Sequence, residues 1–152
     1  MIDRRSAGPD SSPGYWLHHA ALVWRQACEA GLGETTYPQF NVLSAVSLLT
    51  GAEGQAPTQQ QVADFARMDR MMTSKLAHTL EERGMLTRAP DPEDARRQRL
   101  ALTAEGKEVL RTCIAAARRA DEEIFGAGPD VEALRERLRT VAERRPRGPV
   151  AG

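Results

Sequence analysis

The sequence predicts a mainly α-helical fold that carries one small β-hairpin. Apolar residues recur at steps of three and four along most of the chain, which is the spacing of one face of a helix. Two short segments, 85–89 and 98–102, instead have the composition of strands, and a charged turn containing Pro90 and Pro92 joins them. The expected order is four helices, the hairpin and two further helices.

The composition limits the kind of protein. A chain of 152 residues is long enough for a single hydrophobic core. Its 21 basic and 21 acidic residues cancel, so the total charge gives no support for binding to nucleic acid or to a membrane. No apolar run approaches the roughly 20 residues that a membrane span needs, and the first residues lack the apolar segment of a signal peptide. We expect a cytoplasmic protein with no membrane partner.

The sequence offers little for catalysis or cofactor binding. It contains no Gly-rich phosphate loop, no metal-ligand spacing and no nucleophile motif. The two cysteines, Cys28 and Cys113, are expected to be reduced and to act as small buried apolar residues. We therefore expect no enzyme, no cofactor and no metal site.

The first third of the chain predicts an arm and two helices. Residues 1–13 are rich in Gly, Pro and Ser and poor in apolar side chains, which is typical of a disordered arm. A helix is expected from Tyr15 to about Gly31. A second should begin near Tyr37, after a capping-box pattern, and end where two glycines interrupt it. These features rest on Thr36, Gln39, Gly51 and Gly54, and the second helix would bury Phe40, Val42, Leu43, Val46 and Leu49.

Two shorter helices follow. Thr58 and Gln61 repeat the capping-box pattern and begin a third helix, which should bury Val62 together with Phe65 or Ala66. Asp69 is the expected N-cap of a fourth helix that ends near Arg83, before Gly84. Its inward residues would be Thr73, Leu76, Ala77 and Leu80.

The C-terminal third predicts two helices and a tail. Thr103 should cap a long helix that ends near Phe125, with Leu110, Ala117 and Ala120 on its buried face. A last helix would place Val131, Leu134, Leu138 and Val141 on one apolar stripe. Residues 144–152 are expected to be disordered.

The third and fourth helices have the layout of a helix-turn-helix. The turn between them is short, at Arg67–Asp69, and the second helix of such a pair enters the major groove of DNA. Taken alone, the polar side of the fourth helix is as consistent with an ordinary solvated face. The candidate DNA-contacting residues on it are Arg70, Met71, Met72, Ser74, Lys75 and His78.

The hairpin carries arginines near its tip. An arginine there can enter the minor groove, where the electrostatic potential of DNA is most negative. We expect Arg96 and Arg97 to serve this purpose, with Asp94 holding the guanidinium of Arg96 through a charge-assisted pair. A charged turn of this kind is more often only a solvated loop.

The stretch from Tyr37 to Gly106 resembles the multiple-antibiotic-resistance regulator (MarR) family of bacterial winged-helix repressors. Its wing and the start of the following helix match most specifically, together with the end of the recognition helix. The matching segments are Gln39-Phe40-x-Val42-Leu43, Gln60-Gln61-Val62-Ala63, Ser74-Lys75-Leu76-x-x-x-Leu80-Glu81-Glu82-Arg83-Gly84, Asp91-Pro92-x-Asp94-x-Arg96 and Leu102-Thr103-x-x-Gly106.

The resemblance implies a winged helix-turn-helix lobe and a helical dimerisation region built from the N- and C-terminal helices. It implies a symmetric homodimer, double-stranded operator DNA as partner, and often a small aromatic or phenolic effector. The role of Arg96 in the minor groove and of Asp94 beside it is also carried over. The expected division is an arm at 1–13, a dimerisation helix at 14–34, the DNA-binding lobe at 35–103, dimerisation helices at 104–143 and a tail at 144–152.

An effector pocket is expected between the first two helices and the fifth. Its candidates mix aromatic surface with a few polar groups, which is typical of small-molecule sites. They are Trp16, His18, His19, Arg25, Tyr37 and Phe40. For the aromatic residues, packing in the core or in a dimer interface is the simpler interpretation.

Two functions therefore compete. The favoured one is a DNA-binding regulator, most often a repressor, that an effector releases from a palindromic operator. The alternative is a winged-helix module for protein interaction, in which Met71 and Met72 form an apolar contact.

Overall fold

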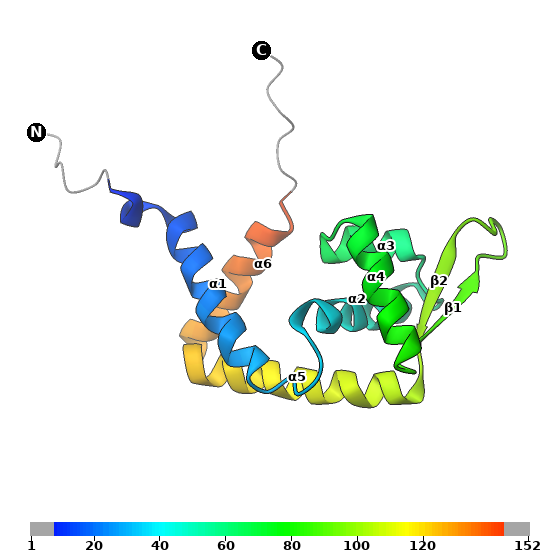
Figure 1. Ribbon diagram of the computed structural model, residues 1–152. Coiled ribbons are helices and arrows are strands. Elements are labelled where there is room, and N and C mark those ends of the chain that lie inside the picture. The colour runs from blue at the N-terminus through cyan, green and yellow to red at the C-terminus, as the bar shows by residue number, and fades with distance from the viewer. Residues whose placement is uncertain (1–7, 145–152) are drawn as a thin grey trace, which may run out of the picture.

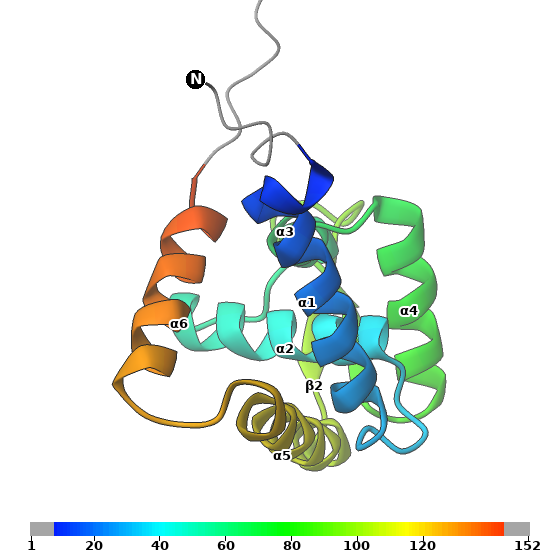
Figure 2. The same cartoon turned by 90° about the vertical axis from the view of Figure 1, so that its left-hand side faces the viewer.

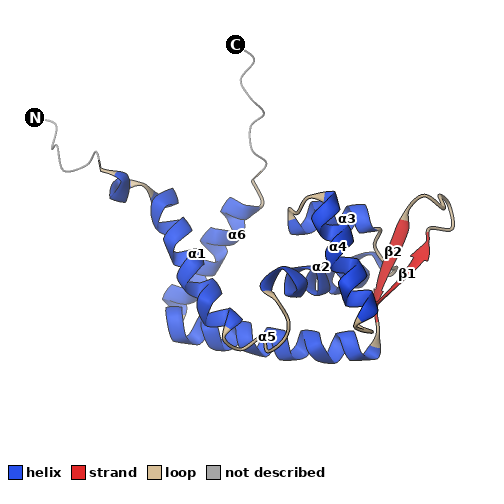
Figure 3. Cartoon of the chain, in the orientation of Figure 1, coloured by secondary structure: helices blue, strands red, loops and turns tan. Residues whose placement is uncertain are grey.

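A computed structural model describes residues 8–144 and confirms the predicted fold class, helices with one two-stranded hairpin (Figure 1). Figure 3 shows how little of the described chain is strand. The longer elements are α1 (Pro13–Glu29), α2 (Tyr37–Glu53), α3 (Gln59–Ala66), α4 (Arg70–Glu82), β1 (Leu86–Pro90), β2 (Gln98–Leu102), α5 (Ala104–Phe125) and α6 (Pro129–Ala142).

The long helix α5 runs along one side of the molecule and connects its two parts. Helices α2, α3 and α4 and the hairpin gather over the N-terminal half of α5, and α1 and α6 lie over its C-terminal half (Figure 1). Figure 2 looks along α5 and shows α1 and α6 as separate helices. The winged lobe, as we use the term, is α2, α3, α4 and the hairpin. No helix in residues 8–144 is long and apolar enough to cross a membrane.

Helix α2 supplies the centre of the core. Val42, Leu43 and Val46 are fully buried on it, as predicted, and Phe40 is 8% exposed. They pack in one cluster with buried residues of the other elements. Each fully buried side chain of this size contributes about 2 kcal/mol to the free energy of unfolding. The cluster members from other elements include Val62, Leu80, Leu86, Leu100 and Cys113.

Side-chain caps begin the helices of the lobe as the sequence predicts. Both capping boxes are present, at Thr36 with Gln39 and at Thr58 with Gln61. Of the two glycines predicted to interrupt this helix, Gly51 lies within α2, which continues to Glu53. It ends at Gly54, which adopts the left-handed conformation that favours glycine, at φ 69°.

The hairpin is antiparallel, and its second strand is also bonded to the segment before α3. Leu86 pairs with Leu102 at its open end, and Pro90 pairs with Gln98 near the tip. The backbone amide of Leu100 donates to the carbonyl of Pro57 at 2.9 Å, which joins β2 to the segment before α3. The strands therefore hold a fixed place beside the start of α3.

The two ends of the described chain differ from the sequence expectation. Part of the arm predicted at 1–13, residues 1–7, lies outside the described residues, but Pro9–Ser11 form one turn of 3-10 helix and α1 already begins at Pro13. Helix α6 forms as expected, yet none of its residues is buried in the single chain. Most of the predicted tail, 145–152, also lies outside the described residues.

Candidate nucleic-acid interface

The turn of the helix-turn-helix is tight and well defined. Arg67 adopts a left-handed conformation, with φ 53° and ψ 43°, and ends α3. The amide of Met68 then bonds back to the carbonyl of Ala63 at 2.9 Å. The side chain of Asp69 accepts from the amide of Met72 at 2.7 Å and so begins α4. The predicted turn is confirmed, and it sets the angle between α3 and α4.

Helix α4 has one buried and one exposed side. Thr73, Ala77 and Leu80 face the core and are fully buried. On the other side Met71 is 77% exposed and Met72 is 49% exposed, and the polar candidates lie with them. Arg70 and Lys75 are exposed and Ser74 is half-buried, which places the first two turns of α4 at the surface.

His78 lies further along α4 and is already engaged with neighbouring side chains. Its Nδ1 is 3.3 Å from a guanidinium nitrogen of Arg88 on β1, and its Nε2 is 3.3 Å from a carboxylate oxygen of Glu82. Arg88 also pairs with Glu81 at 2.8 Å. These contacts join the second half of α4 to the hairpin.

The geometry of Asp94 corrects one expectation. Its carboxylate accepts from the backbone amide of Arg96 at 3.1 Å, rather than from the guanidinium. Its second oxygen lies 3.6 Å from the Nε of Arg97. Asp94 therefore shapes the backbone of the tip, because a residue two positions on presents its amide closer than its side chain. The side chain of Arg96 remains exposed.

A buried ion pair at the loop end of the hairpin was missed by the sequence interpretation. Asp91 is only 4% exposed and lies 2.9 Å from the guanidinium of Arg99. The backbone amide of Glu93 also donates to Asp91 at 2.8 Å. This hydrogen bond, followed by the charge of Arg99, lowers the pKa of the Asp91 carboxyl below its usual range. Arg99 further donates to the carbonyl of Ala56 at 2.5 Å, so the pair fixes the wing to the segment before α3.

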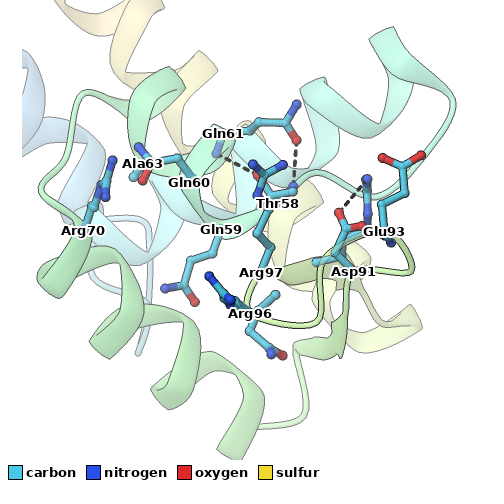
Figure 4. Close-up of a pocket in the computed structure, with 12 residues that line it drawn as sticks. Thr58, Gln59, Gln60, Gln61, Ala63, Arg70, Asp91, Glu93, Arg96 and Arg97 are labelled. Carbon is cyan, nitrogen blue, oxygen red and sulfur yellow. Dashed lines mark hydrogen bonds and ion pairs between the residues drawn. The ribbon is translucent and has the colours of Figure 1, made fainter.

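A cavity of about 640 Å³ separates the wing from the helix-turn-helix (Figure 4). Arg70 borders it from the start of α4, and Arg96 and Arg97 border it from the wing. Gln59, in the first turn of α3, contributes a buried side-chain oxygen that has no hydrogen-bond partner in the described residues. Four arginines, two carboxylates and the N-terminus of α3 line this hollow. Arg99 is paired with Asp91, so the three exposed arginines outweigh Glu93, and the remaining positive charge suits an anion.

The proposed effector residues do not form one pocket. Tyr37 contacts both Trp24 and Phe40 edge to face, with ring centroids 5.9 and 6.2 Å apart, and the Arg25 guanidinium lies 5.0 Å from the Tyr37 ring centroid. His19 instead packs against Tyr15 with the two ring planes tilted by 52°, and His18 contacts His19. Trp16 lines a different, apolar hollow between α1, α5 and α6. The predicted set therefore divides into Arg25, Tyr37 and Phe40 in one place, His18 and His19 in another, and Trp16 in a third.

A second cavity, of about 480 Å³, opens elsewhere between the helices. It lies between the α1–α2 connection, the end of α4 and α5, and Arg83 is the basic residue in its wall. Gln39 accepts a hydrogen bond from Arg83 at 3.1 Å, and the carboxylate of Glu34 lies 3.9 Å from the guanidinium of Arg83. The sequence interpretation missed it, because its walls come from segments far apart in the chain. The remaining wall residues are Leu32, Thr35, Met85, Glu105, Val109, Thr112 and Cys113.

Both cysteines are fully buried thiols. Burial raises the pKa of Cys28, and the neighbouring Cys113 adds to this effect. Burial also raises the pKa of Cys113, although a hydrogen bond with Thr35 opposes it. Neither site favours the reactive thiolate.

Comparison with known proteins identifies the family. The family model described as MarR family matches residues 36–97. The chain is also 32% identical over 123 residues to a Bacillus subtilis (strain 168) protein named uncharacterized HTH-type transcriptional regulator YdcH, covering 80% of this chain and 83% of that protein. This chain belongs to the MarR family.

Solved structures show that the MarR-family fold extends over nearly the whole chain. CouR from Rhodococcus jostii RHA1, bound to p-coumaroyl-CoA, superposes with a TM-score of 0.76 at 24% identity and covers 92% of this chain and 98% of CouR. A MarR mutant from E. coli complexed with operator DNA superposes with a TM-score of 0.73 at 19% identity, covering 93% and 99% of the two chains. The regions that α1 and α6 occupy thus belong to the shared fold, together with the winged helix-turn-helix.

Proposed function

We propose that this MarR-family protein is a homodimer that binds a palindromic operator, acts as a repressor and is released by a small effector. The observation that carries the proposal is the position of three arginines around one hollow. Arg70 comes from the start of α4, and Arg96 and Arg97 come from the wing. They give a protein of zero net charge a local cationic surface.

This surface suits a duplex that spans the recognition helix and the wing. The exposed first turns of α4 would enter the major groove, where Arg70 or Lys75 can donate to guanine and Met71 can pack on a thymine methyl. Arg96 would reach the adjacent minor groove. The phosphates between the two grooves would then pass over the hollow at the N-terminus of α3.

The dimer would use the apolar surface of α1, α5 and α6. A hollow of about 530 Å³ between these helices is lined mostly by apolar residues. Trp16 is 58% exposed there and Leu138 is 40% exposed, which is unusual for a surface that stays in water. Pairing two copies through these helices would bury Trp16 and Leu138. The other apolar lining residues are Pro13, Leu17, Ala20, Ala21, Trp24, Phe125 and Leu134.

The effector would bind in the cavity beside Arg83. A guanidinium there can pair with a carboxylate, and Met85 and Val109 offer apolar surface for an aromatic ring. The cavity touches both α5 and the end of α4, so an occupant can favour one spacing of the two recognition helices over another. CouR, whose structure holds p-coumaroyl-CoA, supports an aromatic acid derivative as the class.

The experiment is a titration of a fluorescent palindrome from the protein's own promoter region with purified protein. We expect binding that weakens steeply as salt rises, because cations on the protein displace counterions from the phosphates. Arg70→Ala and Arg96→Ala should weaken it, and Arg135→Ala, an exposed change on α6, should not. Affinity that is absent or independent of salt would refute the proposal.

A protein-interaction module is the second candidate, because Met71 and Met72 form an exposed apolar pair on α4. In that case Met71→Lys should abolish binding to a protein partner. No palindrome would be bound at any salt concentration.

A further inference from the structure

One side chain connects the helix-turn-helix turn to the far end of α6. The guanidinium of Arg67 donates a hydrogen bond to the carbonyl of Ala142, the last residue of α6, which is 75 positions away in the chain. Among residues 8–144, no other side-chain hydrogen bond joins α6 to another element. The contact therefore links two parts of the molecule that are otherwise joined through α1, α2 and α5.

Both partners are suited to this contact. The last carbonyls of a helix have no partners within it and carry the negative end of the helix dipole, so a cation is favourable there. Arg67 is also the only described residue other than glycine with a positive φ. Glycine would adopt that conformation without strain, so the arginine is present against the local backbone preference.

Helix α6 has few other restraints in the single chain. It follows Gly126 and Gly128, which both have positive φ values and open space around them. None of its residues is buried, and only one side of it approaches the apolar hollow with α1. A helix that begins after two unhindered glycines can turn about that point, unless its other end is held.

We propose that Arg67 is a positioning residue for DNA recognition, because it holds the end of α6 against the helix-turn-helix turn. The part of this inference that concerns DNA rests on the function proposed above. With the tie in place, the lobe has a further attachment to the dimerisation helices, in addition to α5 and to the contact between α1 and α2. The two recognition helices of a dimer are then held at a narrow range of separations, and the protein accepts a narrow range of half-site spacings.

The tie itself is tested without DNA, by hydrogen exchange of the full-length protein. Arg67→Ala keeps a Cβ at the left-handed position, so it removes the contact while leaving the strain of the turn unchanged. We expect amide exchange in the last turn of α6 to become about three- to tenfold faster. Arg67→Lys, which keeps a donor, should give an intermediate rate, and Arg135→Ala should match the wild type. Unchanged exchange in Arg67→Ala overturns the inference.

The positioning role is tested with palindromes whose half-sites are moved apart one base pair at a time. Wild-type protein should bind one spacing best, and Arg67→Ala should bind the neighbouring spacings with a smaller loss of affinity. Arg67→Lys should give a profile between those of the wild type and Arg67→Ala. Faster exchange with an unchanged spacing profile would overturn the positioning role. If no variant binds any palindrome, the proposed function fails, while the exchange rates still decide whether the tie exists.

Discussion

The carboxylate of Asp91 and the guanidinium of Arg99 lie 2.9 Å apart where the two strands of the wing enter its loop, and the carboxylate is almost completely buried. Because Arg99 also bonds the carbonyl of Ala56, the pair connects both strands of the wing to the segment that leads into α3. The direction of the wing tip relative to the helix-turn-helix depends on this connection.

Asp91→Asn is expected to lower the melting temperature at neutral pH, because it leaves Arg99 without a counter-charge. The folded-state pKa of Asp91 lies below the usual 3.8. A carboxyl group of this kind stabilises the fold fully above its unfolded-state pKa, and the contribution is lost as the pH falls through the folded-state pKa. The gap in melting temperature between variant and wild type should be constant above about pH 5 and should close below pH 3.8. Thermal denaturation followed by circular dichroism measures this, and equal melting temperatures at pH 7 would contradict it.

Arg96→Ala is expected to weaken binding to the operator about tenfold to a hundredfold. The side chain is exposed at the wing tip, and its loss removes one cation from the DNA-facing surface. The slope of log affinity against log salt should fall by about 1. Fluorescence anisotropy at several salt concentrations measures both quantities. Arg118→Ala, an exposed change on α5, serves as the control, and equal slopes for the two variants would argue against a phosphate or groove contact by Arg96.

Gly106→Ala is expected to reduce the free energy of unfolding by about 2 kcal/mol or more, because overpacking forces the backbone to move. A Cβ at this position would lie 2.0 Å from the carbonyl oxygen of Met85, and neither backbone can easily shift. Gly51 provides the opposite case, since a Cβ there meets nothing within 4 Å in the described residues. Gly51→Ala should raise the free energy of unfolding by about 0.5 to 1 kcal/mol. Urea denaturation of both variants measures the difference, and a neutral Gly106→Ala would be the unexpected outcome.

Leu138→Asp is expected to shift the protein from dimer to monomer at micromolar concentration. It places a charge in the apolar hollow of α1, α5 and α6, where an interface would bury it. Leu48→Asp is the matched control, because Leu48 is a 59% exposed leucine on α2 that does not line this hollow. Light scattering after size-exclusion chromatography gives the mass. A dimer that persists in the first variant would place the interface elsewhere.

Alkylation of Cys28 and Cys113 by iodoacetamide is expected to be slow in the folded protein at pH 8. Both thiols are buried, and burial raises the pKa of each, so little thiolate is present or accessible. Addition of denaturant should make the reaction fast. Mass spectrometry follows the added groups, and rapid modification without denaturant would point to a reactive, redox-capable cysteine.

The fold could be predicted from the sequence largely because its helix ends are determined locally. Thr58 with Gln61, and Asp69 with the amide three residues on, act within one turn of chain. Of the two glycines predicted to interrupt α2, only Gly54, which has a positive φ, ends it, and Gly51 stays helical.

The site was less predictable, because its contacts join distant positions. The partner of Asp91 lies across the hairpin, so it follows from strand register and not from proximity in sequence. The predicted effector residues do not meet in one pocket for the same reason. Trp16 and Phe40 share aromatic character, but they line separate parts of the molecule. Residue type therefore indicated which groups could bind a ligand, while the tertiary arrangement decided which of them meet.

The helices α2, α3, α4 and α5 begin with a side-chain cap, whereas α6 begins at Gly128 with none and buries no residue. A helix of this length is marginal in water without packing. In the proposed dimer, α6 would gain packing partners that it lacks in the single chain, so part of its stability would come from association. Cellular concentration would then control not only how many regulators exist but also what fraction of their helices is folded.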